Sequence, residues 1–159
     1  MIDRTVVVAL GSNLGDSKEL LVRAIARLED LAAGGFMASS IQVSAPVDCP
    51  AGSPDFLNAV VVFESMSDET PESLLEHLQG LEVEFGRQGK TVMNEPRRLD
   101  LDIIAFGEER RNTAALVIPH PRAHMRLFVM APLAEIMPAY RAPGWPIDAG
   151  GLATALRAS

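Results

Sequence analysis

Apolar residues recur along the chain at spacings that predict four strands. Thr5–Leu10 is almost entirely apolar, which is typical of a buried central strand. Phe36–Ser44 and the valine-rich Phe56–Glu64 are predicted as two further strands. Leu99–Phe106 is predicted as the fourth, because apolar and acidic residues alternate where it begins.

Helical spacing appears in the two segments that connect these strands. The first helix is predicted to follow Asp16 as N-cap, with Glu19 completing a capping box, and to end at Gly34–Gly35. The second is predicted to begin at Thr70–Glu72 and to stop at Gly86. Their apolar stripes are Leu21, Ala24, Ile25, Leu28 and Leu31 in the first helix, and Leu74, Leu78, Leu81 and Phe85 in the second.

The resulting order of elements, βαββαβ, predicts an α+β fold of the ferredoxin-like, split βαβ type. We expect an antiparallel sheet with both helices on one face and a ligand site near the other. After the fourth strand, Leu116–Ile118 is predicted as a short edge strand and Leu127–Ile136 as a short helix interrupted by Pro132. Residues 1–159 are expected to form a single domain, with residues 139–159 as a C-terminal tail that ends in a helical turn.

The net charge of −7 argues against general binding to nucleic acid or to a membrane surface. Residues 87–126 nevertheless hold eight of the fourteen Lys and Arg residues and five of the 21 acids, which indicates a local anionic ligand. Cys49 is the only cysteine, so no intramolecular disulfide is expected. The apolar run near the N-terminus is too short for a signal peptide or a membrane span, so we expect a cytoplasmic protein.

The segment Leu99–Ile103 is the strongest candidate for chemistry. On a strand, Asp100 and Asp102 share one face, roughly 6–7 Å apart. Two carboxylates at this spacing can hold two Mg²⁺ ions about 3.5–4 Å apart, together with the phosphates of a substrate. The alternative is the solvated face of an antiparallel strand. Arg97 and Arg98, directly before the strand, favour a metal site for a polyphosphate.

The segment from Arg87 to Arg98 has no clear periodicity and contains Gly89 and Pro96. Structureless loops of about a dozen residues are uncommon and are often active-site lids. The sequence therefore predicts a lid directly before the acidic strand.

Four motifs, in order along the chain, carry a resemblance to a known family. They are Ala9–Gly15 (ALGSNLG), Pro54–Ala59 (PDFLNA), Pro96–Asp102 (PRRLDLD) and Pro119–Arg122 (PHPR). Together they resemble the 6-hydroxymethyl-7,8-dihydropterin pyrophosphokinases. The resemblance implies an enzyme of folate biosynthesis that moves pyrophosphate from ATP to the hydroxymethyl group of the pterin and releases AMP. It also implies two Mg²⁺ ions as cofactor and ATP as co-substrate. We expect no nucleic-acid or membrane partner, and a monomer.

The same resemblance implies a role for individual residues of this chain. Arg97, Asp100 and Asp102 would be catalytic, and the two aspartates would bind the metal ions. The residues implied for ATP are Glu82, Arg87, Arg97, Ile103, His120 and Arg126. Those implied for the pterin are Ser44, Val47, Phe56, Asn58 and Phe128, with the two aromatic rings stacking on either side of the pterin.

Several of these assignments have a simpler structural alternative. Phe56 and Phe128 would suit a hydrophobic core, His120 a structural position, and Glu82 an ordinary helix surface. Arg97 would suit a salt bridge to the acidic pair.

The chain also departs from the family pattern, because Met93-Asn94-Glu95 stands where Arg-Trp-Gly is usual. Lys90 is expected to supply part of the missing charge. Two other functions therefore remain open. One is a nucleotidyltransferase that uses the aspartate pair, and the other is a non-catalytic protein that binds pterin or nucleotide.

Overall fold

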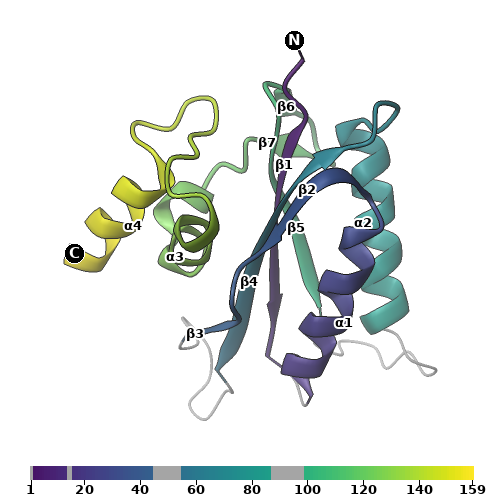
Figure 1. Cartoon of the computed structure of the whole chain (residues 1–159), viewed down its shortest axis with the longest axis horizontal. Helices are drawn as coiled ribbons and strands as arrows, with labels where there is room; N and C mark the ends of the chain where they lie inside the picture. Colours follow the sequence, from purple (N-terminus) through teal and green to yellow (C-terminus); the bar gives the residue numbers. More distant parts are fainter. Residues whose placement is uncertain (1, 14–15, 45–54, 87–98) are drawn as a thin grey trace.

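The computed structural model describes residues 2–13, 16–44, 55–86 and 99–159. In this part of the chain the main sheet is antiparallel, with the strand order β2–β4–β1–β5 (Figure 1). The strands are β1 (Thr5–Ser12), β2 (Ala32–Ala38), β3 (Gln42–Ser44), β4 (Phe56–Ser65) and β5 (Asp100–Phe106). Strand β3 also pairs with β4, beyond the end of β2. The four predicted strand segments are therefore confirmed, although one of them is divided.

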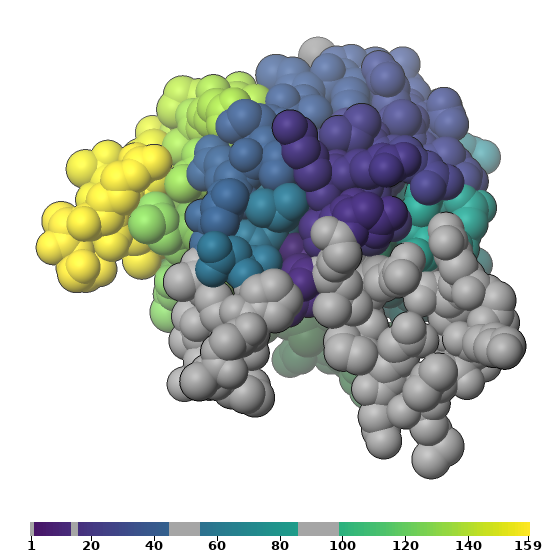
Figure 2. All heavy atoms as spheres, turned by 90° about the horizontal axis from the view of Figure 1, so that it is seen from below, coloured from purple at the N-terminus to yellow at the C-terminus, as the bar shows by residue number. Residues whose placement is uncertain are grey.

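Helices cover both faces of this sheet (Figure 1). One face is covered by α1 (Ser17–Glu29) and α2 (Pro71–Gly86), as predicted. On the other face lie α3 (Leu127–Ile136) and α4 (Ala149–Ala158), so that face is less open than the sequence suggested. Figure 2 shows the C-terminal segment, in yellow, at one side of the molecule beside the green segment that contains α3.

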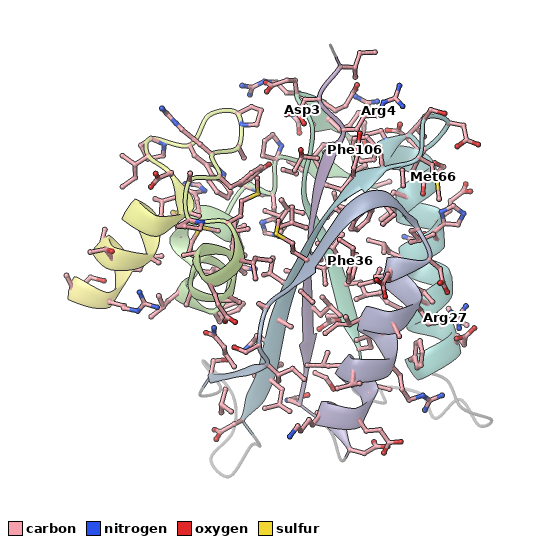
Figure 3. All side chains as sticks on the ribbon, viewed as in Figure 1. Asp3, Arg4, Arg27, Phe36, Met66 and Phe106 are labelled. Carbon is pink, nitrogen blue, oxygen red and sulfur yellow. The ribbon has the colours of Figure 1, made fainter. Side chains whose placement is uncertain are left out.

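Alternation along the strands separates two hydrophobic cores. In β1, Val6, Val8 and Leu10 face α1 and α2, whereas Val7 faces α3 and α4. Because β1 lies between β4 and β5, it is buried on both faces, which explains why its sequence is continuously apolar. Between the two helices of the first layer, Arg27 on α1, labelled in Figure 3, forms an ion pair with Glu84 on α2.

The prediction for the end of the first helix was wrong. Helix α1 ends at Glu29, and Gly34 and Gly35 lie inside β2 instead of capping the helix. Gly35 has a positive φ of 62°, and the pairing of β2 with β4 shifts register on either side of Gly34. The glycines therefore form an irregular, bulged edge strand. The expected capping box is also absent, because the side chain of Asp16 makes no capping hydrogen bond.

The predicted strand Phe36–Ser44 is two strands in the structure. Strand β2 ends at Ala38, and at Ser39 the side chain takes part in the pairing with β4. The Ser39 N–H donates to the Val60 carbonyl at 2.9 Å, and Ser39 Oγ accepts from the Val60 N–H at 2.9 Å. A side-chain oxygen thus satisfies a donor of β4 where the strand is interrupted.

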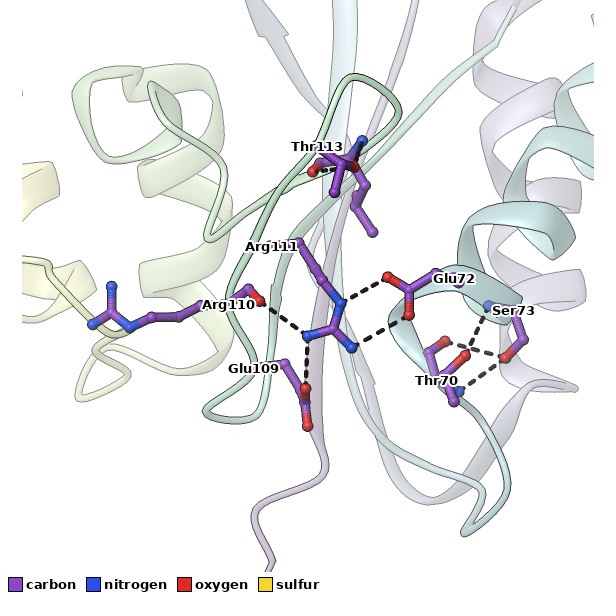
Figure 4. Close-up of polar contacts among 8 residues, drawn as sticks. Thr70, Glu72, Ser73, Glu109, Arg110, Arg111 and Thr113 are labelled. Carbon is purple, nitrogen blue, oxygen red and sulfur yellow. Dashed lines mark hydrogen bonds and ion pairs between the residues drawn. The ribbon is translucent and has the colours of Figure 1, made fainter.

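The N-terminus of α2 is capped as the sequence predicted. Thr70 Oγ1 accepts a hydrogen bond from the Ser73 N–H at 3.0 Å, and Ser73 Oγ accepts from the Thr70 N–H at 2.9 Å. Figure 4 shows this reciprocal cap beside the ion pair between Arg111 and Glu72. The ion pair attaches Arg111, the first residue of β6 (Arg111–Asn112), to the first turn of α2.

The segments after β5 differ from the prediction in three ways. Strand β7 (Val117–Ile118) pairs with β6 (Arg111–Asn112) in a separate small sheet, not at the edge of the main one. Pro132 lies inside a continuous α3. The expected terminal turn is the ten-residue helix α4, which begins where Asp148 Oδ1 accepts from the Gly151 N–H at 2.9 Å.

No helix in the described ranges is both long and apolar enough to cross a membrane.

Candidate active site

A cavity of about 280 Å³ lies at one end of the sheet face that α3 covers. Its volume is close to the lower limit for small-molecule sites. The floor comes from Ala9–Gly11 of β1 and from side chains of β4 and β5, and the wall comes from Ala123 and α3. Strands that lie far apart in the sequence therefore meet here, at the end of the second core.

Asp100 and Asp102 both line this cavity, on the face opposite to Leu101. Strand β5 pairs with β1 so that Gly11 lies opposite Asp100 and Ala9 lies opposite Asp102. The predicted alternation is confirmed, because Leu99, Leu101 and Ile103 belong to the core under α1 and α2. The two carboxylates are thus presented to the cavity by a strand that the core anchors from behind.

Glu82 contacts the backbone of this acidic strand from the other side. Its Oε2 accepts a hydrogen bond from the Leu101 N–H at 2.9 Å. Since Leu101 lies between the two aspartates, Glu82 fixes the backbone of β5 between the residues that carry both carboxylates. Glu82 itself is not among the described residues that line the cavity.

His120 lies in the cavity wall and is held in a defined orientation. Its backbone N–H donates to the Ile104 carbonyl at 2.8 Å, and its Nδ1 accepts from the Arg122 N–H at 3.1 Å. Because Nδ1 accepts, the neutral ring carries its proton on Nε2.

The pKa of His120 is lowered from its ordinary value, chiefly because the ring is partly buried. The Asp102 carboxylate raises this pKa, while the charges of Arg126, Arg122 and His124 lower it further. The neutral ring with a proton on Nε2 is therefore the favoured form at neutral pH.

Arg126 and Phe128 form a stacked pair at the start of α3. The guanidinium carbon lies 5.7 Å from the centre of the Phe128 ring, which is a cation–π contact. Both residues line the cavity. The residue implied for ATP and the aromatic residue implied for the pterin are therefore adjacent in space.

The predicted pterin residues on the sheet also gather here. Phe56, Asn58 and Ser44 line the cavity, and β3 pairs with β4 so that Ser44 lies opposite Phe56. Asn58 is buried, and its Nδ2 donates to Ser44 Oγ at 2.7 Å. This hydrogen bond fixes the Asn58 amide, with Nδ2 turned toward Ser44 and Oδ1 on the side of Gly11.

Some predicted residues are placed elsewhere. The Ile103 side chain lies in the core under α1 and α2, whereas Ile104 lines the cavity. The ATP role of Ile103 stays a prediction. Ile104 is two residues from Asp102, and the period of the strand could have identified it. Val47, Arg87 and Arg97 lie outside the described residues.

The donor set of the cavity suits a magnesium ion that also binds a substrate. Asp100 and Asp102 offer hard carboxylate oxygens, the ligands that Mg²⁺ prefers. In the described ranges no group of three or more His, Cys, Asp or Glu residues could hold a metal. Mg²⁺ commonly binds one or two carboxylates and completes its shell with water and phosphate, so two aspartates are sufficient.

Fold and cavity together define an α+β protein whose binding site combines a carboxylate pair, an arginine, a histidine and an aromatic ring. The sequence profile of the 7,8-dihydro-6-hydroxymethylpterin-pyrophosphokinase (HPPK) family matches residues 7–138. The chain belongs to this family.

Relatives in bacteria and plants support this membership. A 2-amino-4-hydroxy-6-hydroxymethyldihydropteridine pyrophosphokinase of Bacillus subtilis is 44% identical over 130 residues, covering 81% of this chain and 75% of the relative. The protein of that name from Pseudomonas aeruginosa is 39% identical over 144 residues, covering 90% and 86%. A folate synthesis bifunctional protein of Arabidopsis thaliana is 34% identical over 132 residues, which cover 83% of this chain and 27% of that protein.

Solved structures share the fold at low sequence identity. The chain aligns with an HPPK-DHPS structure in complex with substrates at a TM-score of 0.71 and 12% identity, over 98% of this chain and 43% of that one. The wild-type HPPK-DHPS of Plasmodium falciparum aligns at a TM-score of 0.70 and 13% identity, over 96% and 41%. The chain therefore corresponds to less than half of these larger proteins, and the likeness concerns the fold.

Proposed function

We propose that this chain transfers pyrophosphate from ATP to 6-hydroxymethyl-7,8-dihydropterin and releases AMP, as a step of folate biosynthesis. The observation that carries the proposal is the position of Asp100 and Asp102 in one cavity with Asn58 and Phe128. This arrangement supports a site for a metal-bound polyphosphate beside a site for a flat heterocycle. The names of the relatives supply the identity of that heterocycle.

In this proposal Asp100 and Asp102 would hold two Mg²⁺ ions, which would supply positive charge to neutralise the phosphates of ATP. Positioning and electrostatic stabilisation carry most of the catalysis in phosphoryl transfer. The pterin hydroxyl attacks the β-phosphorus of ATP in line, the bond from this phosphorus to the oxygen that it shares with the α-phosphate breaks, AMP leaves, and the hydroxyl proton is released to solvent.

The described cavity supplies two donors that suit this reaction. Arg126 provides a permanent positive charge, and neutral His120 provides an Nε2–H. Both stabilise negative charge on the transferring group without taking up a proton. Arg97 and Arg87 are proposed to contribute further positive charge from the segment outside the described residues.

The pterin is proposed to lie between Phe56 and Phe128, with its polar edge against Asn58. Flat rings gain on the order of 1 kcal/mol from offset stacking beyond the area they bury. Since Nδ2 of Asn58 is directed to Ser44, its Oδ1 is left to accept a hydrogen bond from the amino edge of the pterin. Val47 is proposed to complete this part of the pocket.

The strand order supports assigning the fold to the ferredoxin-like type. Two βαβ units interlock, because β4 lies between β1 and β2 while β1 lies between β4 and β5. We further propose that residues 1–159 form one domain. The packing of Trp145 and Leu152 in the core under α3 supports including residues 139–159 in it.

Identifying the nucleotide product tests the proposal directly. The protein is incubated with ATP, Mg²⁺ and 6-hydroxymethyl-7,8-dihydropterin, and the nucleotides are separated by chromatography. We expect AMP in an amount equal to the pterin diphosphate formed. Pyrophosphate with a nucleotidylated pterin would indicate a nucleotidyltransferase instead, and bound ligands without turnover would indicate a non-catalytic binding protein.

A further inference from the structure

Glu135 joins α3 to the junction between β2 and β3 by three hydrogen bonds. Its Oε1 accepts from the Ser40 N–H at 2.9 Å, and its Oε2 accepts from Ser40 Oγ at 2.7 Å and from Gln42 Nε2 at 2.9 Å. Both carboxylate oxygens are therefore used. These hydrogen bonds lower the pKa of Glu135 below its ordinary value, so the acceptor is ionised at neutral pH and the bonds are charge-assisted.

On the sheet side, the hydrogen bonds of Glu135 reach β3, and β3 contributes Ser44 to one wall of the cavity. Gln42 lies opposite Asn58 in the pairing of β3 with β4, and Ser44 lies opposite Phe56. Ser44 in turn accepts the hydrogen bond from Asn58 at 2.7 Å. The position of β3 thus determines where the amide of Asn58 is directed.

On the helix side, Glu135 belongs to α3, which also carries Phe128 in the opposite wall of the cavity. Glu135 follows Phe128 by seven residues on α3, which is about two turns, so the two side chains share a helix face. The contact with Ser40 and Gln42 therefore restrains both the distance of α3 from the sheet and the rotation of α3 about its own axis. A small rotation of α3 would move Phe128 with respect to Asn58.

We propose that Glu135 is a positioning residue for the heterocycle half of the site, setting the separation between the Ser44–Asn58 wall and the Phe128 wall. The inference rests on the proposed function and extends it to a residue outside the cavity. Glu135 is exposed and contributes nothing to either hydrophobic core, so its carboxylate acts through these three hydrogen bonds.

Apart from Arg126, which lies at the start of α3 beside Phe128, the described nucleotide half of the site is anchored independently of Glu135. Asp100 and Asp102 are carried by β5, which pairs with β1 and is held by Glu82. His120 is held by the Ile104 carbonyl and the Arg122 N–H. Loss of the Glu135 contact should therefore weaken pterin binding much more than ATP binding.

The test measures affinity for the two ligands separately in Glu135→Ala. Calorimetric titration gives the Kd of 6-hydroxymethyl-7,8-dihydropterin and that of Mg-ATP, and steady-state assays give the two KM values and kcat. Because a small misplacement of one wall weakens the contacts that a bound ligand makes, we expect the Kd for the pterin to rise about tenfold. The Kd for Mg-ATP should stay within about twofold of the wild-type value.

Three further variants separate positioning from a general loss of structure. Glu135→Gln keeps an acceptor oxygen for Ser40 and should recover most of the pterin affinity. Ser40→Ala should add little to the effect of Glu135→Ala, because both changes break the same contact. Glu76→Ala removes an exposed acid on α2 and should leave both affinities unchanged. Thermal unfolding of each variant shows that the titrations are made on folded protein.

The outcomes distinguish this inference from the proposed function. Wild-type protein that binds the pterin but forms no AMP refutes the proposed reaction, and the Kd comparison still tests Glu135. An unchanged pterin Kd in Glu135→Ala, or equal losses for pterin and ATP, overturns the positioning role. Wild-type protein that does not bind the pterin overturns both.

Discussion

The Leu101 N–H donates to Glu82 Oε2 at 2.9 Å, so a carboxylate on α2 fixes β5 midway between Asp100 and Asp102. The resemblance implied that Glu82 contacts ATP, and the alternative was an ordinary helix-surface acid. The structure shows a third role, which is to satisfy a backbone donor of the strand that presents the aspartate pair.

This role predicts different effects for two substitutions of Glu82. Glu82→Gln keeps an acceptor for Leu101 and should retain most of the activity. Glu82→Ala leaves a backbone donor without this partner at a cost of about 1–3 kcal/mol, and kcat/KM should fall about tenfold. The ratio of the two kcat/KM values decides between the roles, because equal losses would favour direct use of the carboxylate in ATP binding over a backbone role.

The hydrogen bond between Asn58 and Ser44 predicts an effect on pterin binding alone. Ser44→Ala removes the acceptor for Asn58 Nδ2, and the amide of Asn58 is then free to turn. A lost hydrogen bond of this kind costs about 1 kcal/mol, so the KM for the pterin should rise roughly fivefold. Val43→Ala, at a largely exposed neighbour on β3, is the control and should leave KM unchanged. A rise in the KM for ATP instead would contradict the assignment.

The lowered pKa of His120 predicts how stability depends on pH. Below its ordinary pKa of 6.5, this histidine takes up a proton more readily in the unfolded chain than in the folded one. Its contribution to the unfolding free energy is therefore complete above about pH 6.5 and is lost as the pH falls toward the folded pKa.

Denaturant unfolding of wild-type protein and His120→Asn at pH 5 to 7.5 measures this contribution. As the pH is lowered, the unfolding free energy of the variant should fall less steeply than that of the wild-type protein, because the asparagine amide does not titrate. Parallel curves for the two proteins would mean that His120 is not responsible.

Substitution of Gly107 should destabilise the protein for two reasons, a clash with a neighbouring backbone and a strained backbone conformation. It has a φ of 52°, and a Cβ at this position would lie 2.1 Å from the Asp3 carbonyl oxygen. Figure 3 shows Asp3 and Phe106 at the same end of the sheet. Gly107→Ala should lower the unfolding free energy by about 3 kcal/mol or more, since strain alone costs about 1–3 kcal/mol.

Gly35→Ala is the matched control for this substitution. Gly35 has a φ of 62° and nothing within 4 Å of its would-be Cβ, so strain acts there without a clash. Its unfolding free energy should fall by only about 1–2 kcal/mol, measured in urea. Equal losses at the two glycines would contradict the close approach to Asp3.

Much of the site could be predicted because it depends on local periodicity. Alternation placed Asp100 and Asp102 on one strand face, and the spacing of two residues placed Phe56 and Asn58 on another. The same rule places Ile104 at the cavity and Ile103 on the opposite face of β5. The pterin and ATP roles of these residues, and the monomeric state, stay predictions.

The remaining features depend on contacts that local patterns do not encode. A glycine pair is compatible with a helix end or with a bulged strand, and the pairing of β2 with β4 decides between them at Gly34–Gly35. The contact of Glu135 with Ser40 joins residues 95 positions apart in the sequence. The helices that cover the second face are short, and one of them contains Pro132.

The measurement that most directly tests the central claim is pterin-dependent AMP formation as Mg²⁺ is raised, in wild-type protein and in Asp100→Ala and Asp102→Ala. Asp68→Ala, at an exposed turn residue, is the matched control. We predict that wild-type protein and the control form AMP only with Mg²⁺ and the pterin. Both cavity variants should fold normally yet lose most of the activity. Near-normal turnover in the two variants, or AMP formation in the presence of a chelator, would contradict the account.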